Sequence, residues 1–215
     1  PVARLRFGLE MLADIESAER RREKLNAMDH DIEQLDQLID EILTYARLEQ
    51  GTPNIEFQPV VIGELCEQLR DELETIRDET AITVANPYPT LEVEAEERYL
   101  HRVLQNLVTN ALRYAQSRIV MRVEESEDQV VIHVDDDGPG IPEHERERVF
   151  KPFARLDKSR HRASGGYGLG LSIVKRIVDW HGGEIRVDER PEGGARVTVT
   201  LPKSQQGQHV LGRMG

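Results

Sequence analysis

The 215-residue chain has one cysteine, no long apolar run and too few basic residues to balance its acidic ones. A single cysteine, Cys66, cannot build a disulfide framework or a Cys-based metal site, so we expect a reducing, cytosolic setting and place Cys66 in the core. No stretch approaches the roughly 20 apolar residues that cross a bilayer. The sequence therefore predicts no membrane span.

The chain carries a large excess of acidic residues. Lys and Arg number 28 against 40 Asp and Glu, which gives a formal net charge of −12. A surface this acidic repels nucleic acid and anionic lipid unless its basic residues gather in one place. Nucleic acid is therefore not an expected partner. The length fits one ordinary domain with a smaller appendage.

Residues 1–50 predict two antiparallel helices joined by a polar turn at 17–22. In the second helix, apolar residues are spaced alternately three and four, as in a heptad seam. An ordinary core stripe would look the same, but two helices with so little other core must bury their seams on another copy or another domain. We expect a homodimer through a four-helix bundle. The seam residues are Leu25, Met28, Ile32, Leu35, Ile39, Ile42 and Ala46.

Glycine and proline mark a linker at residues 51–60, and predicted helices and strands alternate from residue 61 to residue 203. Their order predicts an α+β fold: an α/β sandwich with a mixed, mostly antiparallel sheet and helices on one face. The polar tail at 204–215 is predicted to be disordered. Helices are expected at 62–79, 96–115, 143–149 and 169–181, and strands at 82–85, 91–93, 118–124, 129–135, 184–188 and 196–201.

Asn106 and Asn110 lie four residues apart in a predicted amphipathic helix, so they share a face that Arg113 extends. Amide oxygens at the rim of a core can complete a Mg²⁺ shell that otherwise consists of phosphate oxygens and water. Two surface or capping asparagines would give the same pattern, so the pair alone does not assign a metal site.

Asp136 follows the strand predicted at 129–135 and continues its row of inward-facing valine and isoleucine residues. A carboxylate in that row needs strong donors, and the exocyclic amine of a purine would serve. Gly138 and Gly140 then allow the backbone to turn closely around a flat ligand. A solvated acidic turn is the alternative, and it is what we expect of Asp135 and Asp137.

Residues 151–162 carry a positive net charge in a chain whose net charge is negative. They hold five Lys or Arg residues against one acid, Asp157. A polyphosphate ligand explains that reversal. Glycines at 165, 166, 168 and 170 follow, before a helix whose start can present free N–H groups to an anion. The pattern is neither a Walker A loop nor a Rossmann fingerprint. A flexible linker loop is the alternative.

Together and in this order, these motifs resemble the N, G1, F and G2 boxes of the histidine-kinase ATPase fold, in the superfamily of gyrase, chaperone and mismatch-repair ATPases. The likeness covers residues 60–202 and implies the Bergerat-type sandwich, with ATP and Mg²⁺ as ligands. By position it implies Asn106 and Arg113 as catalytic residues and Asn110 as the Mg²⁺ ligand. The implied ATP-binding residues are Asn106, Asn110, Arg113, Tyr114, Asp136, Gly138, Gly140, Ile141, Phe153, Arg155, Lys158, Gly166, Tyr167, Gly168, Leu169 and Gly170.

The resemblance implies a bacterial two-component sensor histidine kinase, closest to RstB-type and osmosensor-type members. Such a kinase transfers the γ-phosphoryl group of ATP to a histidine and then to an aspartate of a response regulator. Hydrolytic members of the superfamily have Glu where this chain has Asn106, which removes a base for activating water. A catalytically silent nucleotide-binding and dimerisation module and a gyrase-type ATP hydrolase remain as alternatives.

The N-terminal hairpin resembles the dimerisation and phosphotransfer domain of the family, truncated so that Pro1 matches the Pro that follows the acceptor histidine. The acceptor is then expected outside this chain, since none of the seven histidines has its context. The resemblance implies a response regulator that docks near Arg4, Phe7 and Gly8. It also implies the cytoplasmic portion of an inner-membrane protein, attached to the membrane only through missing N-terminal parts.

Overall fold

The computed structural model describes residues 5–7, 9, 17–49, 55–74, 80–156 and 167–205. The chain divides into two compact units, Pro1–Arg47 and Leu48–Gly215. Among the described residues, no helix combines the length and the apolar character that a bilayer span requires. The boundary between the units falls a few residues before the linker predicted at 51–60.

One long helix, α2 (Ala18–Glu49), carries most of the first unit. The polar turn predicted at 17–22 is wrong, because α2 starts at Ala18. Ser17 caps this start: its hydroxyl oxygen accepts from the N–H of Arg20, and its carbonyl accepts from the N–H of Arg21. The charged residues that follow are Glu, Arg and Lys, which are good helix formers, so the segment continues as helix.

The second unit contains a five-stranded sheet in the order β2-β4-β5-β7-β6. Only β2 and β4 pair in parallel, so the sheet is mixed and mostly antiparallel, as predicted. A separate antiparallel pair joins β1 to β3, with Val60 opposite Val93. The strands are β1 (Gln58–Val61), β2 (Ala81–Ala85), β3 (Glu92–Ala95), β4 (Arg118–Glu125), β5 (Gln129–Asp136), β6 (Glu184–Glu189) and β7 (Ala195–Pro202).

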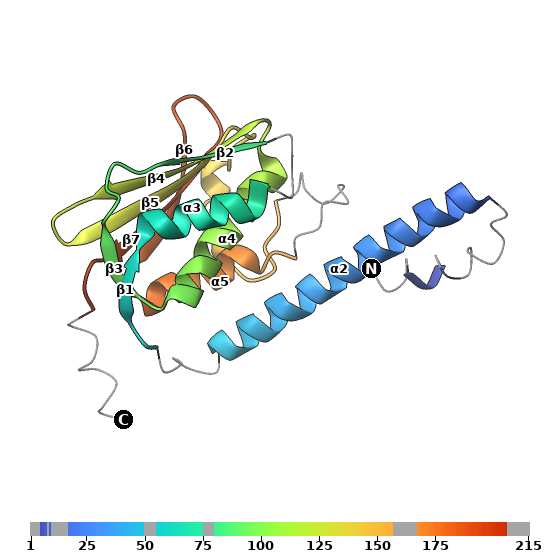
Figure 1. Ribbon diagram of the computed structural model, residues 1–215, viewed down its shortest axis with the longest axis horizontal. Coiled ribbons are helices and arrows are strands. Elements are labelled where there is room, and N and C mark those ends of the chain that lie inside the picture. The colour runs from blue at the N-terminus through green and yellow to red at the C-terminus, as the bar shows by residue number, and fades with distance from the viewer. Residues whose placement is uncertain are drawn as a thin grey trace. The chain divides into compact units, whose positions relative to one another are not determined.

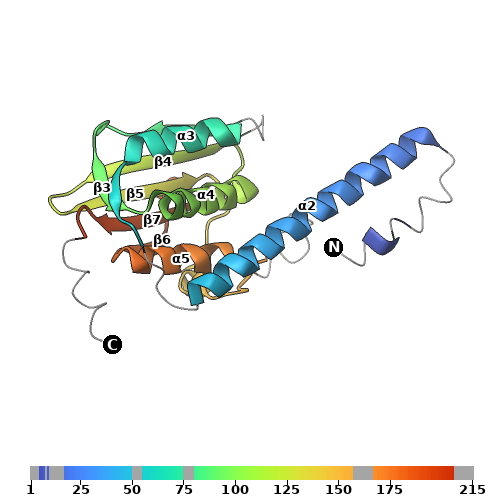
Figure 2. The same cartoon turned by 60° about the horizontal axis from the view of Figure 1, so that its bottom comes forward.

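Three helices, α3 (Ile62–Glu74), α4 (Glu97–Tyr114) and α5 (Gly170–Trp180), lie side by side on one face of this sheet (Figure 1 and Figure 2). This arrangement confirms the predicted sandwich. The helix predicted at 143–149 is instead two short 3₁₀ turns, η1 (Glu143–Glu145) and η2 (Arg148–Phe150). There, main-chain bonds link residues three apart, as from the N–H of Arg146 to the carbonyl of Glu143.

The core lies between the helices and the sheet. On β5, Val130, Ile132 and Val134 are buried against the helices, and Asp136 is the next residue in that row, at 7% exposed. The alternation predicted for this strand is therefore observed, and it carries a carboxylate into a largely apolar environment.

The opposite face of β5 differs from the prediction at Asp135, which was expected in a solvated turn. Asp135 is 1% exposed, because Arg196 stands opposite it on β7 and covers it. The Nε and Nη2 of Arg196 donate to the two carboxylate oxygens at 2.7 and 2.6 Å. Asp135 is thus a buried, paired acid on the face of the sheet that points away from Val130, Ile132 and Val134.

His181 closes the C-terminal end of α5 and is 1% exposed. Its Nδ1 donates to the carbonyl of Ile177 at 2.8 Å, and its Nε2 accepts the N–H of Glu96 at 3.2 Å. The carbonyl of His181 accepts from the side chain of Gln205 at 2.8 Å, and the hydroxyl of Ser204 donates to Glu94. Residues 204 and 205 of the predicted disordered tail are therefore held on the domain, and 206–215 lie outside the described residues.

We expect the fold to lose stability as the pH falls below about 6.5, the ordinary pKa of histidine. Burial lowers the pKa of His181, and a protonated Nε2 could not accept from Glu96. Below this pH, His181 takes up a proton in the unfolded chain but not in the folded chain. The free energy of unfolding falls by at most about 1.4 kcal/mol per pH unit until the pH reaches the folded pKa.

Urea unfolding at about pH 7.5 and about pH 5.5 measures this slope. His181→Gln should reduce the slope, because Gln takes up no proton, while His133, whose pKa burial also lowers, keeps its own share. His144→Gln changes an exposed histidine and should keep the slope of the wild type. A His181→Gln variant with an unchanged slope would contradict the assignment.

Candidate functional site

The first predicted motif lies on one face of α4. Asn106, Asn110, Arg113 and Tyr114 are all half-buried. The side-chain N–H of Asn106 donates to the carbonyl of Arg102 at 2.8 Å, which fixes the amide and leaves its oxygen as an acceptor. A Cβ at Gly170 would lie 3.0 Å from that oxygen. The first and last of the four motifs therefore meet where α5 begins.

Asp136, the acid of the second motif, is held by main-chain donors. Its Oδ1 accepts from the N–H of Gly138 at 2.8 Å and of Ala195 at 3.4 Å. Within the part of the chain that is described, both bonds end on Oδ1, so Oδ2 remains for a ligand. Burial raises the pKa of Asp136, and the N–H donors and the charge of Arg190 oppose that rise.

Gly138 brings the loop after β5 against the end of α4. A Cβ at Gly138 would lie 2.6 Å from the carbonyl oxygen of Tyr114, so no side chain fits there. Asp137 strengthens the contact, since its carboxylate accepts from the N–H groups of Gln116, Ser117 and Arg118 and from the Ser117 hydroxyl. The first two motifs are thus joined.

Asp137 was expected in a solvated turn, and that expectation is also wrong. It is half-buried, and its carboxylate acts as a cap for the chain that leaves α4. Although burial opposes the change, the hydrogen bonds from Ser117, Arg118 and Gln116 lower the pKa of Asp137. The side chain therefore stays ionised, and its role is to hold two elements together.

The turn between β6 and β7 is the part of the site that the sequence did not reveal. Gly140, with a φ of 71°, packs on Gly194, whose own φ is 98°. A Cβ at Gly194 would overlap the carbonyl oxygen of Asp136. Gly193 and Gly194 lie between the strands predicted at 184–188 and 196–201, where a glycine next to a strand can signal a close backbone approach.

Phe153 and Gly168 flank residues 154–167, which hold four of the five basic residues of 151–162 and are called the basic segment below. The N–H of Phe153 donates to the carbonyl of Gly168 at 2.8 Å. Phe153 has a φ of 62° and is 63% exposed, and such a strained backbone in a non-glycine residue is a mark of functional sites. Arg155 and Tyr167 lie just inside these ends and are half-buried, whereas Lys158 and Gly166 lie outside the described residues.

The start of α5 offers main-chain donors. Among the described residues no side chain caps this end, and the hydroxyl of Ser172 donates to the carbonyl of Leu169 at 2.8 Å. The first N–H groups of a helix have no partner within the helix, so this end can bind an anion. Leu169 itself is fully buried, so only its main chain can reach a ligand.

Ile141, another predicted site residue, follows Gly140 in the loop after β5. Its carbonyl oxygen accepts a hydrogen bond from the Nε of Arg146 at 3.2 Å.

The residues around Asn110 suit a metal ion that is coordinated mainly by a bound polyphosphate and by water. Among the described residues, no group of three or more His, Cys, Asp or Glu side chains could hold a metal ion. A single amide oxygen would have to be completed by phosphate oxygens and water, which is a coordination that Mg²⁺ accepts. The residues present therefore fit Mg²⁺ only together with a polyphosphate.

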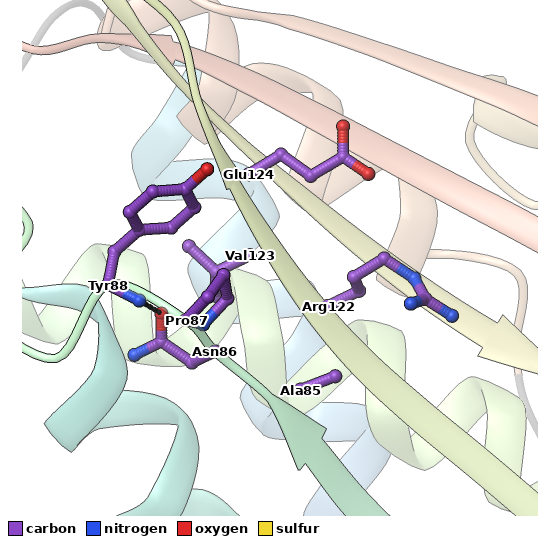
Figure 3. A pocket seen from close by; sticks show the side chains of 7 residues that line it. All are labelled: Ala85, Asn86, Pro87, Tyr88, Arg122, Val123 and Glu124. Atoms are coloured by element: carbon purple, nitrogen blue, oxygen red, sulfur yellow. Dashed lines mark hydrogen bonds between the residues drawn. The ribbon is translucent and has the colours of Figure 1, made fainter.

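A hollow of about 470 Å³ lies elsewhere, at β2 and β4 (Figure 3). Its wall includes Tyr88, whose N–H donates to Asn86 at 3.0 Å. None of its lining residues belongs to the predicted motifs. Asn86 and Glu124 make no link to Asp136, so this hollow is separate from the candidate site.

Comparison with known proteins agrees with the geometry. Residues 95–205 match the family of histidine kinase-, DNA gyrase B- and HSP90-like ATPases, and residues 1–51 match the His Kinase A (phospho-acceptor) domain. Sensor protein RstB of Escherichia coli K12 is 39% identical over 206 residues, which cover 94% of this chain and 46% of RstB. The chain thus spans about half the length of this relative.

Solved structures share the fold. Full-length ShkA in complex with AMPPNP has a TM-score of 0.72 and 26% identity, over 91% of this chain and 42% of ShkA. Histidine kinase ThkA in complex with response regulator protein TrrA has a TM-score of 0.75 and 25% identity, over 96% of this chain and 61% of ThkA. The likeness to RstB is confirmed, and the likeness to osmosensor kinases stays a prediction. The chain belongs to the family of histidine kinase-, DNA gyrase B- and HSP90-like ATPases, among its bacterial sensor histidine kinases.

Proposed function

We propose that this chain binds ATP with Mg²⁺ and transfers the γ-phosphoryl group to a histidine, as the catalytic part of a two-component sensor kinase. The buried carboxylate of Asp136, with one oxygen left for a ligand, supports this proposal most strongly. The amino group of adenine suits that oxygen, because it is a donor that a buried acid requires. ShkA, a relative in fold, was solved with AMPPNP.

The remaining residues fit the phosphates. The uncapped start of α5 and the Asn106 oxygen beside Gly170 lie together, with Arg113 on the same helix face as Asn106. Asn110 would hold Mg²⁺, which would supply positive charge to the phosphate oxygens. Arg155, Lys158 and Tyr167 belong to the basic segment that would cover the phosphates. Positioning and charge neutralisation are then the main sources of catalysis.

Asn106 favours transfer over hydrolysis. Its side-chain nitrogen donates to Arg102, and a neutral amide cannot take a proton from water. The gyrase-type ATP hydrolase is therefore less well supported than a phosphotransferase. In the transfer reaction, a histidine nitrogen forms a bond to the γ-phosphorus as the bond to the β-γ bridging oxygen breaks, and ADP leaves.

Transfer is tested by supplying an acceptor. A longer partner chain that contains the acceptor histidine is mixed with this chain and γ-labelled ATP. Label on the partner is the expected result, and a partner whose acceptor is replaced by Gln is the control. Steady release of phosphate without labelling would support the hydrolase, and nucleotide binding without either reaction would support the silent module.

The partners of the whole protein are also proposals. Ile32 and Ile39 of the seam on α2 are 47% and 52% exposed, and we infer that a second copy covers them in a four-helix bundle. ThkA was solved with a response regulator, so we expect a regulator to dock near Phe7, with Arg4 and Gly8 outside the described residues. Light scattering should give the mass of a dimer, and a monomer at micromolar concentration would contradict the bundle.

The setting of the whole protein follows from its relatives. We propose that the chain is the cytoplasmic portion of an inner-membrane sensor, joined to the membrane through parts that precede it, because the relatives are sensor kinases about twice as long. Fractionation of cells that express the complete gene would test this. Recovery of the complete protein in the soluble fraction would contradict it.

A further inference from the structure

The turn between β6 and β7 packs on the main chain of Asp136. Gly194 has a φ of 98°, and a Cβ there would overlap the carbonyl oxygen of Asp136. The next residue, Ala195, donates its N–H to Oδ1 of Asp136 at 3.4 Å. Only a glycine allows the turn to approach so closely. The turn therefore fixes the place where β5 ends and its last side chain begins.

Arg190 begins this turn and is 7% exposed. Its Nη1 donates to the carbonyl oxygen of Asp136 at 3.0 Å, and its Nη2 donates to the carboxylate of Glu192 at 3.0 Å. Main-chain bonds between Arg190 and the two glycines close the turn. Burying a guanidinium costs free energy unless strong acceptors surround it. One of the acceptors of Arg190 is the carbonyl oxygen of Asp136, the residue on which the proposed function rests most.

The charge of Arg190 also bears on Asp136. The neighbouring acid, Asp135, already has a bidentate partner in Arg196. The Nε of Arg190 lies 3.9 Å from Asp135, which is too long for a hydrogen bond, and this nitrogen is buried without a partner among the described residues. Burial raises the pKa of Asp136 and Arg190 opposes the rise, so the cation favours the ionised form that accepts hydrogen bonds.

We propose that Arg190 is a positioning residue that makes the site selective for a purine with an amino group, by anchoring the main chain of Asp136 and aiming its carboxylate. The inference rests on the proposed function and deepens it. Arg190 contacts Asp136 from the side of the β6–β7 turn and acts on the ligand only through that residue.

The test compares two ligands in variants of Arg190. Arg190→Met keeps an apolar stem and removes the guanidinium. ATP should bind about tenfold more weakly to it, because a charged hydrogen bond is lost. The triphosphate of purine riboside, which lacks the amino group, should change by less than about twofold. Arg190→Lys keeps the charge and should recover part of the preference for ATP. Arg186→Met is the control, since it removes an exposed Arg of β6 that pairs with Asp188.

Each result of this ligand comparison either supports or contradicts the positioning role of Arg190. Equal losses for both ligands would overturn the inference, because they would show a purely structural role. If Arg190→Met does not fold, Arg190→Lys carries the comparison: one ammonium cannot replace both Nη contacts, so its preference must lie below that of the wild type, and an unchanged preference overturns the inference. A wild-type chain without ATP affinity refutes the proposed function, and the role of Arg190 falls with it. A wild-type preference that Arg190→Met retains refutes only the inference.

Discussion

Asp136→Asn should weaken ATP binding by about 10- to 100-fold, the range expected when a charged hydrogen bond is lost. Asn keeps the shape of the side chain and an oxygen for the N–H groups of Gly138 and Ala195, which donate to Oδ1 in the wild type. The second oxygen is replaced by an amide NH₂ group. This group and the adenine amine are both hydrogen-bond donors, so they cannot bond to each other. The loss should therefore depend on the ligand.

Calorimetric titration with ATP and with purine riboside triphosphate measures this dependence. The variant should lose much more affinity for ATP than for the ligand without the amino group. Asp128→Asn makes the same change at an exposed position in the turn between β4 and β5 and should leave both affinities unaltered. Equal losses for the two ligands would remove Asp136 from the role of reading the purine.

The same substitution should not destabilise the unliganded protein. Burial raises the pKa of Asp136, which means that the fold disfavours its ionised form. A neutral Asn removes that cost, so the free energy of unfolding should equal or exceed that of the wild type. A variant that loses both stability and ATP affinity would indicate a purely structural acid.

Asn110→Ala should remove the effect of Mg²⁺ on ATP binding. In the wild type we expect Mg²⁺ to raise ATP affinity about tenfold, because Asn110 would hold the ion beside the phosphates. Without that oxygen, the affinities with and without Mg²⁺ should agree within about twofold. Under the proposed function, phosphoryl transfer should fall by at least about 100-fold, because the phosphates would lose a neutralising ion.

Titrations with and without millimolar Mg²⁺ test this directly. Gln105→Ala is the matched control, because it removes an exposed amide from the same helix. It should keep the full Mg²⁺ effect. A variant at Asn110 whose Mg²⁺ dependence is unchanged would show that the ion is bound by other residues.

The sequence predicted those parts of the fold that rest on local patterns. The alternation of β5 showed that Asp136 faces the core, because a strand turns successive side chains to opposite sides. The same alternation placed Asp135 on the other face but could not show what lies there. Arg196, 61 residues away along the chain, covers Asp135. Periodicity gives the direction of a side chain, and its surroundings depend on the strand that pairs next to it.

Strand β1 (Gln58–Val61) was missed for a related reason. Two of its four residues are exposed, and Pro59 argues against a strand, so the segment resembled the linker before it. Its pairing partner β3 stabilises it, with Val60 opposite Val93. Arg190 escaped detection in the same way, because its bond to Asp136 spans 54 residues. Short strands and positioning residues depend on contacts that no local window contains.

The bond from Ala195 to Asp136 has a consequence for the order of events during protein synthesis. It joins residues 59 apart, so the surroundings of Asp136 cannot be complete until the last hairpin has left the ribosome. The main-chain bonds of helix α2 link residues four apart, so its turns can form as soon as that segment has left the ribosome. A nascent chain that ends before residue 190 would contain every motif found in the sequence. It would still lack the β6–β7 turn that contacts Asp136.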